Sequence, residues 1–366
     1  MQPDYDNRLR QLRARMGAGN IDAALITEPH NIFYLCGSNG GYTGARICLI
    51  VDAGTSVLVI DKRYLAEAEE NAVADKMVAW TEAGYKHLAE VVQELDATAI
   101  SFESGHVTVR QHERLKKDFD KIEGIELIGI SGLVEPIREV KDEYELQKIA
   151  EAARIGDRAF DHILEYIKPG VTEMAVAIEL DFFMRRIGAE RSSFETIVAS
   201  GVHSAVPHAT PTHKKIEPGD FVKLDFGAVV DGYHSDMSRT VVVGKASERQ
   251  KEVYAKVLEA QVVALNMVSP GMACKDIDAV ARNIISQAGF GENFVHGLGH
   301  GVGLEVHEIP TLAPNSEMVL KNNMVTTIEP GIYINGFGGV RVEDLVIVSE
   351  IGCKILSHST KDLLEL

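Results

Sequence analysis

The strongest constraint on the fold of this chain is a duplication in its second half. Two stretches, each roughly 100 residues long, are predicted to run through a long helix, a Pro-Gly break, a second helix and then β-strands. In the first stretch the second helix is expected from about Glu173 to Ile187. In the second stretch a capping-box pattern at Ser247 begins a helix that is expected to reach about Met267. This period is too long for a solenoid and predicts two related half-domains packed together.

Each half ends in two predicted strands joined by a tight turn. The turns are Asp231-Gly232 in the first half and Asn335-Gly336 in the second, and both pairs are strong hairpin signals. The expected arms are residues 221–228 and 234–243 in the first hairpin, and residues 325–334 and 340–348 in the second. The sequence therefore predicts two pseudo-equivalent hairpins.

Each predicted hairpin carries one acidic residue on each arm. Asp225 and Asp236 are nearly equidistant from the first turn, and Glu329 and Glu343 are equidistant from the second. Like charges that face each other on a sheet are destabilising unless a cation lies between them. A single acid such as Asp225 could instead pair with Lys223 on the same face of its strand. Four acids in two matched hairpins favour a metal site.

A segment rich in histidine and glycine, residues 296–308, lies between the hairpins. His296 and His300 are four residues apart, as in a helical zinc pair, but the intervening glycines argue against a helix and predict extended backbone. Four carboxylates and one imidazole form an oxygen-dominated set without thiolates, which favours Mn²⁺, Co²⁺ or Fe²⁺ over structural zinc. Two divalent ions would balance the four charges and activate a water molecule, so the expected chemistry is metal-assisted hydrolysis.

The composition argues against several classes of function. With a net charge of −17, the protein is expected to bind neither nucleic acid nor anionic membranes. The longest apolar stretches, residues 32–36 and 47–51, are far too short to span a membrane, and no secretory signal is visible. The cysteines are scattered, which predicts reduced thiols and a cytoplasmic location; they are Cys36, Cys48, Cys274 and Cys353.

A length of 366 residues predicts two domains. The first part alternates strand and helix patterns and is expected to be an α/β domain. Strands are expected at residues 23–26, 47–51, 56–60, 99–102 and 127–130, and helices near residues 8–16, 64–72 and 107–119. The expected limits are 1–131 for the N-terminal domain, 132–142 for a linker interrupted by Pro136, and 143–366 for the catalytic domain.

These motifs resemble those of the pita-bread metallopeptidases, in the branch of prolidase (Xaa-Pro dipeptidase) and aminopeptidase P. The matching stretches cover the second half in order, at residues 197–201, 207–208, 224–227, 232–240, 296–308, 327–331 and 339–343. The resemblance implies an α+β fold. A creatinase/aminopeptidase-like pita-bread catalytic domain with a pseudo-two-fold duplication would follow the α/β N-terminal domain.

The resemblance implies that five residues hold two divalent metal ions. Asp236 and Glu343 would bridge both ions, Asp225 would bind one alone, and His300 and Glu329 would complete the other. Glu329 would also carry a proton from the activated water to the departing nitrogen. Mn²⁺ is the first expectation for both ions, with Co²⁺, Fe²⁺ or Zn²⁺ as alternatives.

The resemblance also places other residues near the substrate. His208 would lie across the cleft and stabilise the tetrahedral intermediate or the leaving group, and His307 would contact the substrate near the scissile bond. Arg341 lies two residues before Glu343, on the same strand face, and would brace the acidic cluster or the substrate. His296 would support the metal ligands from behind or have a purely structural role.

The implied activity is hydrolysis of the Xaa-Pro bond at the N-terminus of short proline-containing peptides, by a homodimer. Some dipeptide-preferring relatives have an arginine at the position of Thr311, where it can bind the free carboxylate of proline, and asparagine or arginine is common at the position of His203. An Xaa-Pro dipeptidase and an aminopeptidase P that acts on longer peptides therefore both stay open. A remote alternative is a metal-free creatinase-like hydrolase or a non-catalytic peptide-binding relative. Such relatives usually lose several of the five ligands, and all five are present here.

Overall fold

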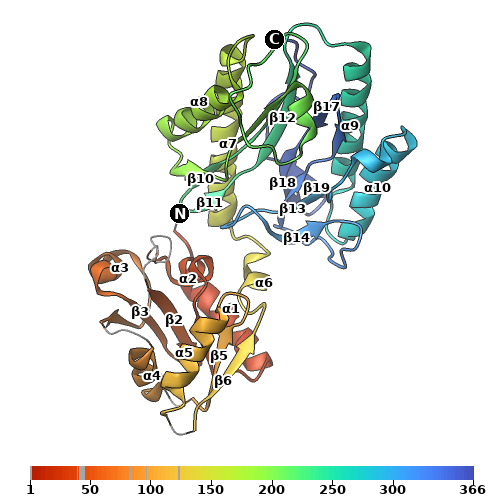
Figure 1. Cartoon of the computed structure of the whole chain (residues 1–366). Helices are drawn as coiled ribbons and strands as arrows, with labels where there is room; N and C mark the ends of the chain where they lie inside the picture. Colours follow the sequence, from red (N-terminus) through yellow and green to blue (C-terminus); the bar gives the residue numbers. More distant parts are fainter. Residues whose placement is uncertain (1, 39, 41–45, 82–84, 96, 123) are drawn as a thin grey trace. The chain divides into compact units, whose positions relative to one another are not determined.

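The computed structural model of the chain describes all residues except 1, 39, 41–45, 82–84, 96 and 123. The chain forms two compact units, Met1–Arg138 (unit 1) and Glu139–Leu366 (unit 2), and each is described by itself (Figure 1). Both units combine helices with sheets, in agreement with the expected α+β class. The finer domain limits expected from the sequence stay a prediction.

Two observations apply to the whole described chain. All four cysteines are free thiols within it. No helix among the described residues is both long enough and apolar enough to cross a membrane.

Unit 1 is built on a six-stranded mixed sheet in the order β4-β3-β2-β1-β5-β6. The strands are β1 (Ala23–Ile26), β2 (Ile47–Asp52), β3 (Ser56–Asp61), β4 (Lys76–Trp80), β5 (Ala99–Glu103) and β6 (Glu126–Ile130). The helices are α1 (Tyr5–Ala18), α2 (Pro29–Cys36), η2 (Lys62–Tyr64), α3 (Leu65–Asn71), α4 (Lys86–Gln93), α5 (Val109–Phe119) and α6 (Glu135–Arg138). Each strand expected from an apolar run is present to within one residue. Strand β4 has no counterpart among the expected strands, and only its last residue is buried.

Unit 2 contains the duplication that the sequence predicts. Each half supplies a pair of packed helices, and the two pairs flank the strands (Figure 1). The helices are α7 (Glu143–Tyr166), α8 (Glu173–Arg186), η3 (Gly201–Ala205), α9 (Glu248–Met267), α10 (Cys274–Gln287) and η4 (Gly291–Asn293). The first half has strands β7 (Arg191–Ser192), β8 (Ile197–Ser200), β9 (Phe221–Phe226), β10 (Ala228–Val230), β11 (Tyr233–His234) and β12 (Met237–Val242). The second half has β13 (Gly299–Gly301), β14 (Glu308–Leu312), β15 (Val325–Ile328), β16 (Gly331–Ile334), β17 (Gly338–Arg341), β18 (Asp344–Ser349) and β19 (Gly352–Ile355).

The first helix of each half begins at a capping box. In α7, Asp142 and Glu145 exchange hydrogen bonds with each other's backbone amides, and in α9 Ser247 and Gln250 do the same. The capping box predicted at Ser247 is therefore confirmed. Behind these helices, each half has its own apolar core between the helix pair and the strands.

The first hairpin of unit 2 offsets its two acids. Asp225 pairs with Ser238 in the β9–β12 ladder, and β10–β11 closes with Val230 opposite Tyr233. Asp225 therefore lies five residues before the closing pair, whereas Asp236 lies only three residues after it. Their near-equal distances from the turn suggest directly opposed residues. In the structure the two aspartates are instead diagonal neighbours.

The second hairpin places its acids opposite each other. The β15–β18 and β16–β17 ladders share one register. Glu329 and Glu343 lie in the gap between these ladders, at opposed positions. This arrangement confirms the prediction from their equal distances to the turn at Gly336.

Candidate metal centre

The five residues expected to hold metal ions all lie on strands or at strand ends of unit 2. Asp225 is in β9, Asp236 lies just before β12, His300 is the middle residue of β13, Glu329 follows β15, and Glu343 lies between β17 and β18. All five line one pocket. The first half of the duplication thus supplies the two aspartates, and the second half supplies the histidine and the two glutamates.

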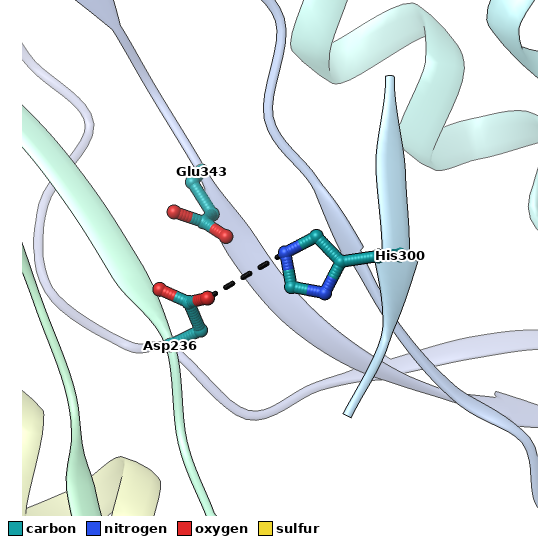
Figure 2. Close-up of side chains that lie close together, drawn as sticks. All are labelled: Asp236, His300 and Glu343. Atoms are coloured by element: carbon teal, nitrogen blue, oxygen red, sulfur yellow. Dashed lines mark ion pairs between the residues drawn. The ribbon is translucent and has the colours of Figure 1, made fainter. Parts of the chain in front are cut away.

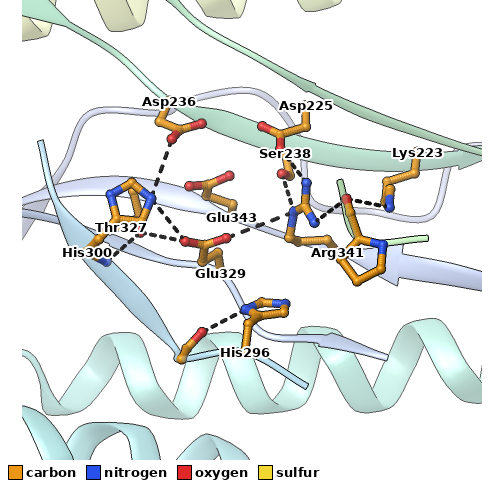
Figure 3. A network of polar contacts seen from close by, with 12 residues as sticks. Lys223, Asp225, Asp236, Ser238, His296, His300, Thr327, Glu329, Arg341 and Glu343 are labelled. Atoms are coloured by element: carbon orange, nitrogen blue, oxygen red, sulfur yellow. Dashed lines mark hydrogen bonds and ion pairs between the residues drawn. The ribbon is translucent and has the colours of Figure 1, made fainter. Parts of the chain in front are cut away.

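Three of these side chains converge on one point (Figure 2). One ligand atom from each of Asp236, His300 and Glu343 lies within 4.8 Å of the other two. The Nε2 atom of His300 is 3.6 Å from Oδ2 of Asp236 and 3.2 Å from Oε1 of Glu329. Glu329 therefore joins the cluster through the imidazole (Figure 3).

The backbone around His300 is extended, as the glycines predicted. A Cβ atom added at Gly299 would lie 2.0 Å from the carbonyl oxygen of Thr327, so only glycine allows β13 to lie this close to β15. The N–H of His300 donates to Oγ1 of Thr327 at 3.1 Å, and the Thr327 hydroxyl donates to Glu329 at 3.1 Å. The Nδ1 atom of His300 lies 3.1 Å from the carbonyl oxygen of Gly301, which leaves Nε2 to face the carboxylates.

Arg341 braces the acidic cluster from within the protein (Figure 3). Its Nη2 bonds to Oδ2 of Asp225, its Nε donates to Oγ of Ser238 at 2.7 Å, and its Nη1 donates to Oη of Tyr333 at 2.8 Å. Its Nε also lies 4.0 Å from a carboxylate oxygen of Glu329. Because the side chain is only 2% exposed, this geometry fits the first of the two roles expected for Arg341, the bracing of the cluster.

The pKa values of the acids are shifted in different directions. Burial and the charge of Glu343 raise the pKa of Asp236 well above its ordinary value, and burial and the charges of Glu329 and Asp225 do the same for Glu343. Burial also opposes the ionisation of Glu329, but its hydrogen bond with His300 and the positive charge there lower its pKa to about 2. The site thus holds more negative charge than it can stabilise without cations.

Three carboxylate oxygens of the cluster point to the same conclusion. Oδ1 of Asp225, Oδ1 of Asp236 and Oε1 of Glu343 are buried and have no hydrogen-bond partner among the described residues. A buried acceptor without a partner costs about 1–3 kcal/mol, and more when it is charged. Three such atoms in one cluster, beside an imidazole nitrogen, form the donor set that divalent cations bind. The residues therefore fit the metal ions expected from the sequence.

The cluster opens into a pocket of about 440 Å³ within unit 2. His208, His307 and Thr311 are exposed and line this pocket. The ring of His307 packs edge-on against that of His300, with centroids 4.3 Å apart. Burial lowers the pKa of His307, and the charge of His300 adds to the shift. The apolar part of the lining is contributed by Phe194, Ile197, Ala209 and Val306.

His296 supports the cluster indirectly. It also lines the pocket, but its Nε2 lies 2.9 Å from Oη of Tyr333, and Tyr333 in turn accepts a hydrogen bond from Arg341. The imidazole of His296 is thus connected to the acids through a tyrosine and an arginine. Sequence reasoning missed Tyr333, since it lies in an apolar strand and nothing in its neighbourhood marks it as polar.

Lys223 does not neutralise Asp225, which was the alternative weighed for this strand. Its ammonium instead donates to three backbone carbonyl oxygens, those of Ser204, Val206 and Pro207. Burial and the charge of Arg341 lower the pKa of Lys223 to about 6, whereas the charge of Asp225 opposes this shift.

A buried cluster of carboxylates and one imidazole at the base of a pocket is typical of metal-dependent hydrolases. Residues 147–350 match the model of metallopeptidase family M24, and residues 8–140 match the creatinase/prolidase N-terminal domain. The chain therefore belongs to metallopeptidase family M24, and it carries the N-terminal domain found with that family's creatinases and prolidases.

Individual relatives are similar over nearly the whole chain. The Xaa-Pro dipeptidase of Pyrococcus furiosus is 38% identical over 365 residues, covering 98% of this chain and 99% of that protein. The structure of an Xaa-Pro dipeptidase from Bacillus anthracis has a TM-score of 0.93 at 41% identity and covers 99% of this chain and 100% of its own. The X-Pro aminopeptidase of Thermotoga maritima has a TM-score of 0.88 at 36% identity, with 96% and 100% coverage. These similarities confirm the resemblance stated from the motifs.

Proposed function

We propose that this protein hydrolyses the Xaa-Pro bond at the N-terminus of short peptides, as an Xaa-Pro dipeptidase. The observation that carries the proposal is the set of three buried carboxylate oxygens without partners, at the base of a pocket that also contains two exposed histidines. The named activities of the Pyrococcus and Bacillus relatives support the choice of substrate.

The metal ions are proposed to be held by the five residues expected from the sequence. Asp225, Asp236, His300, Glu329 and Glu343 would together hold two divalent ions. When bound, divalent ions supply Lewis-acid polarisation of a carbonyl and lower the pKa of water. We propose Mn²⁺ as the ion, because the donors are mostly carboxylate oxygens.

The remaining roles belong to side chains of this chain. Glu329, whose pKa is lowered to about 2, would take a proton from the activated water and pass it to the departing nitrogen. His208 would donate a hydrogen bond to the oxygen on which negative charge develops. His307 would orient the substrate, and Arg341 would hold Asp225 in position through its buried hydrogen bond.

An Xaa-Pro aminopeptidase that accepts longer peptides is the second candidate. Thr311, rather than an arginine, lines the pocket. Among the described residues that line it, Arg341 is the only arginine or lysine, and its donors are already used within the cluster. A free proline carboxylate would therefore find no unused lysine or arginine among the described residues that line this pocket. The similarity to the Thermotoga X-Pro aminopeptidase favours the same alternative.

The decisive experiment compares Xaa-Pro dipeptides with Xaa-Pro-Yaa tripeptides, each with chelated protein and with added Mn²⁺. Turnover of both that depends on Mn²⁺, with higher kcat/KM on the dipeptide, is expected for a dipeptidase. Activity on tripeptides alone would establish the aminopeptidase. Undiminished turnover by the chelated protein would refute the metal proposal. Co²⁺, Fe²⁺ and Zn²⁺ are compared in the same assay.

The proposal includes a homodimer, as the family resemblance implies, and a cytoplasmic location, as the scattered cysteines predict. Sedimentation or light scattering of the purified protein tests the first statement, and fractionation of the source cells tests the second. A monomer at assay concentration would remove the dimer from the proposal without affecting the chemistry.

A further inference from the structure

The loop that carries His208 is held by buried charged side chains. This loop, residues 200–212 (the His208 loop), leaves the end of β8 and begins with η3. His208 is exposed towards the pocket, whereas Glu173 and Lys223, which bond to the loop, are 0% exposed. The loop is therefore anchored from the protein interior rather than from its surface.

Glu173, the first residue of α8, ties together the two ends of the His208 loop. Its Oε1 accepts the N–H of Ser200 at 2.7 Å and the hydroxyl of Ser200 at 2.9 Å. Its Oε2 accepts the N–H of Thr212 at 3.1 Å and the hydroxyl of Thr212 at 2.7 Å. Nδ1 of His203 lies 3.0 Å from the same oxygen. One buried carboxylate thus fixes the width of the loop at its base, and His203 takes part in this contact.

Lys223 holds the part of the loop that leads directly into His208. Its Nζ donates to the carbonyl oxygens of Ser204 at 3.1 Å, Val206 at 2.5 Å and Pro207 at 3.0 Å. These three acceptors match the three donors of an ammonium group. A neutral amine would keep two of these three hydrogen bonds, so most of the anchor is present in either protonation state of Lys223.

Strand β9 connects this anchor to the metal centre. Lys223 and Asp225 are two residues apart and lie on the same face of the strand (Figure 3). Arg341, which bonds to Asp225, also donates through Nη1 to the carbonyl oxygen of Pro207 at 3.2 Å. The same strand and the same arginine therefore set the position of a candidate metal ligand and of the residue before His208.

We propose that Lys223 is a positioning residue that holds His208 at a fixed distance from the metal centre, with Glu173 fixing the base of the loop. The proposal rests on the proposed function, because the role of His208 does. Lys223 acts through His208 and does not itself touch the substrate. Its loss is expected to lower turnover only while His208 is present.

A double-mutant cycle tests this dependence. Lys223→Met keeps the length and apolar character of the side chain but removes its donors, and His208→Ala removes the group that is positioned. Each single change is expected to lower kcat by about 10- to 100-fold, and the double variant is expected to be no slower than the worse single variant, since coupled residues are not additive. If the two losses in kcat multiply in the double variant, the proposal is overturned. If Lys223→Met does not fold, Lys223→Gln, which keeps an amide donor, takes its place in the cycle.

A second measurement is independent of activity. The N–H of Val206 bonds to the carbonyl oxygen of His203, so hydrogen exchange in peptides covering residues 200–212 reports on the order of the loop. Lys223→Met is expected to accelerate exchange there by about 10-fold or more, as expected when a local anchor is lost. The matched control is Lys148→Met, which removes a lysine that pairs with Asp231 on another part of unit 2 and leaves the loop unchanged.

The two measurements separate the failure of this proposal from the failure of the proposed function. If the wild-type protein with Mn²⁺ cleaves no Xaa-Pro peptide, the proposed function is wrong and the exchange experiment alone decides the role of Lys223. Unchanged exchange in Lys223→Met would overturn the positioning role even in an active enzyme.

Discussion

Glu343→Gln should stabilise the metal-free protein and destabilise the metal-bound protein relative to wild type. The nearest carboxylate oxygens of Glu343 and Asp236 lie within 4.8 Å, where two full charges repel by roughly 3.5 kcal/mol at an effective dielectric constant of about 20. Burial and neighbouring carboxylates raise the pKa of both acids, and the charge of Glu343 is one of those that raise the pKa of Asp236. A gain of about 1–3 kcal/mol is therefore expected for the variant at pH 8 with a chelator present.

The sign of the pH dependence follows from the same shifts. A carboxyl group whose pKa is raised by folding contributes stability below its unfolded pKa, and this stability is lost as the pH rises through the folded pKa. The advantage of Glu343→Gln over wild type should therefore grow between pH 5 and pH 8. With saturating Mn²⁺ the order should invert, because binding at 100 times Kd stabilises the wild type by about 2.7 kcal/mol.

Calorimetry or circular dichroism is the suitable assay, since the single tryptophan, Trp80, belongs to unit 1. Each kcal/mol corresponds to a shift of about 2–4 °C in the Tm of a unit of this size. The matched control is Glu350→Gln, at an exposed position of the same unit, which should change stability by less than about 0.5 kcal/mol in either state. If chelated Glu343→Gln were no more stable than wild type at pH 8, the argument from carboxylate repulsion would be refuted.

Three further substitutions test the framework around the site. Gly299→Ala forces a Cβ atom against the carbonyl oxygen of Thr327 and should cost about 2–3 kcal/mol in urea unfolding; an unchanged midpoint would contradict the need for glycine. Tyr333→Phe removes the hydroxyl that joins the imidazole of His296 to the guanidinium of Arg341. This variant should bind Mn²⁺ about 10-fold more weakly in titration calorimetry. Equal affinity would show that the link is dispensable. Asp344→Ala leaves Arg239 buried without its carboxylate partner and should lower the free energy of unfolding by about 3–5 kcal/mol. A loss below about 1 kcal/mol in denaturant unfolding would argue that this ion pair contributes little.

The sequence predicts those features that depend on local spacing. The second hairpin is an example, because a tight turn at Gly336 fixes which residues face each other, and Glu329 and Glu343 follow from counting. The cap at Ser247 is another, since both partners of a capping box lie within four residues. Extended backbone at His300 follows from the glycines on either side of it.

The features that escaped prediction depend on contacts between distant segments. Asp225 and Asp236 are offset because Val230 and Tyr233 close the turn. The composition of the turn does not specify this closing pair. The partners of Lys223 lie 16–19 residues before it, in a loop. Local spacing indicates only the nearer carboxylate of Asp225 as a partner. Tyr333 reaches its polar partners only when two strands and the glycine-rich segment are assembled.

The residues that line the pocket differ in their exposure to solvent, and this difference matters for inhibition. Its carboxylates are largely buried, whereas His208 and His307 are exposed. A blocking compound can therefore reach the two histidines from solvent, but it needs a narrow metal-chelating head to reach the acids. A volume of about 440 Å³ leaves room beside that head for one compact apolar group against Phe194 and Ile197. Compounds with a bulky head would bind at the histidines alone and leave the metal ligands untouched.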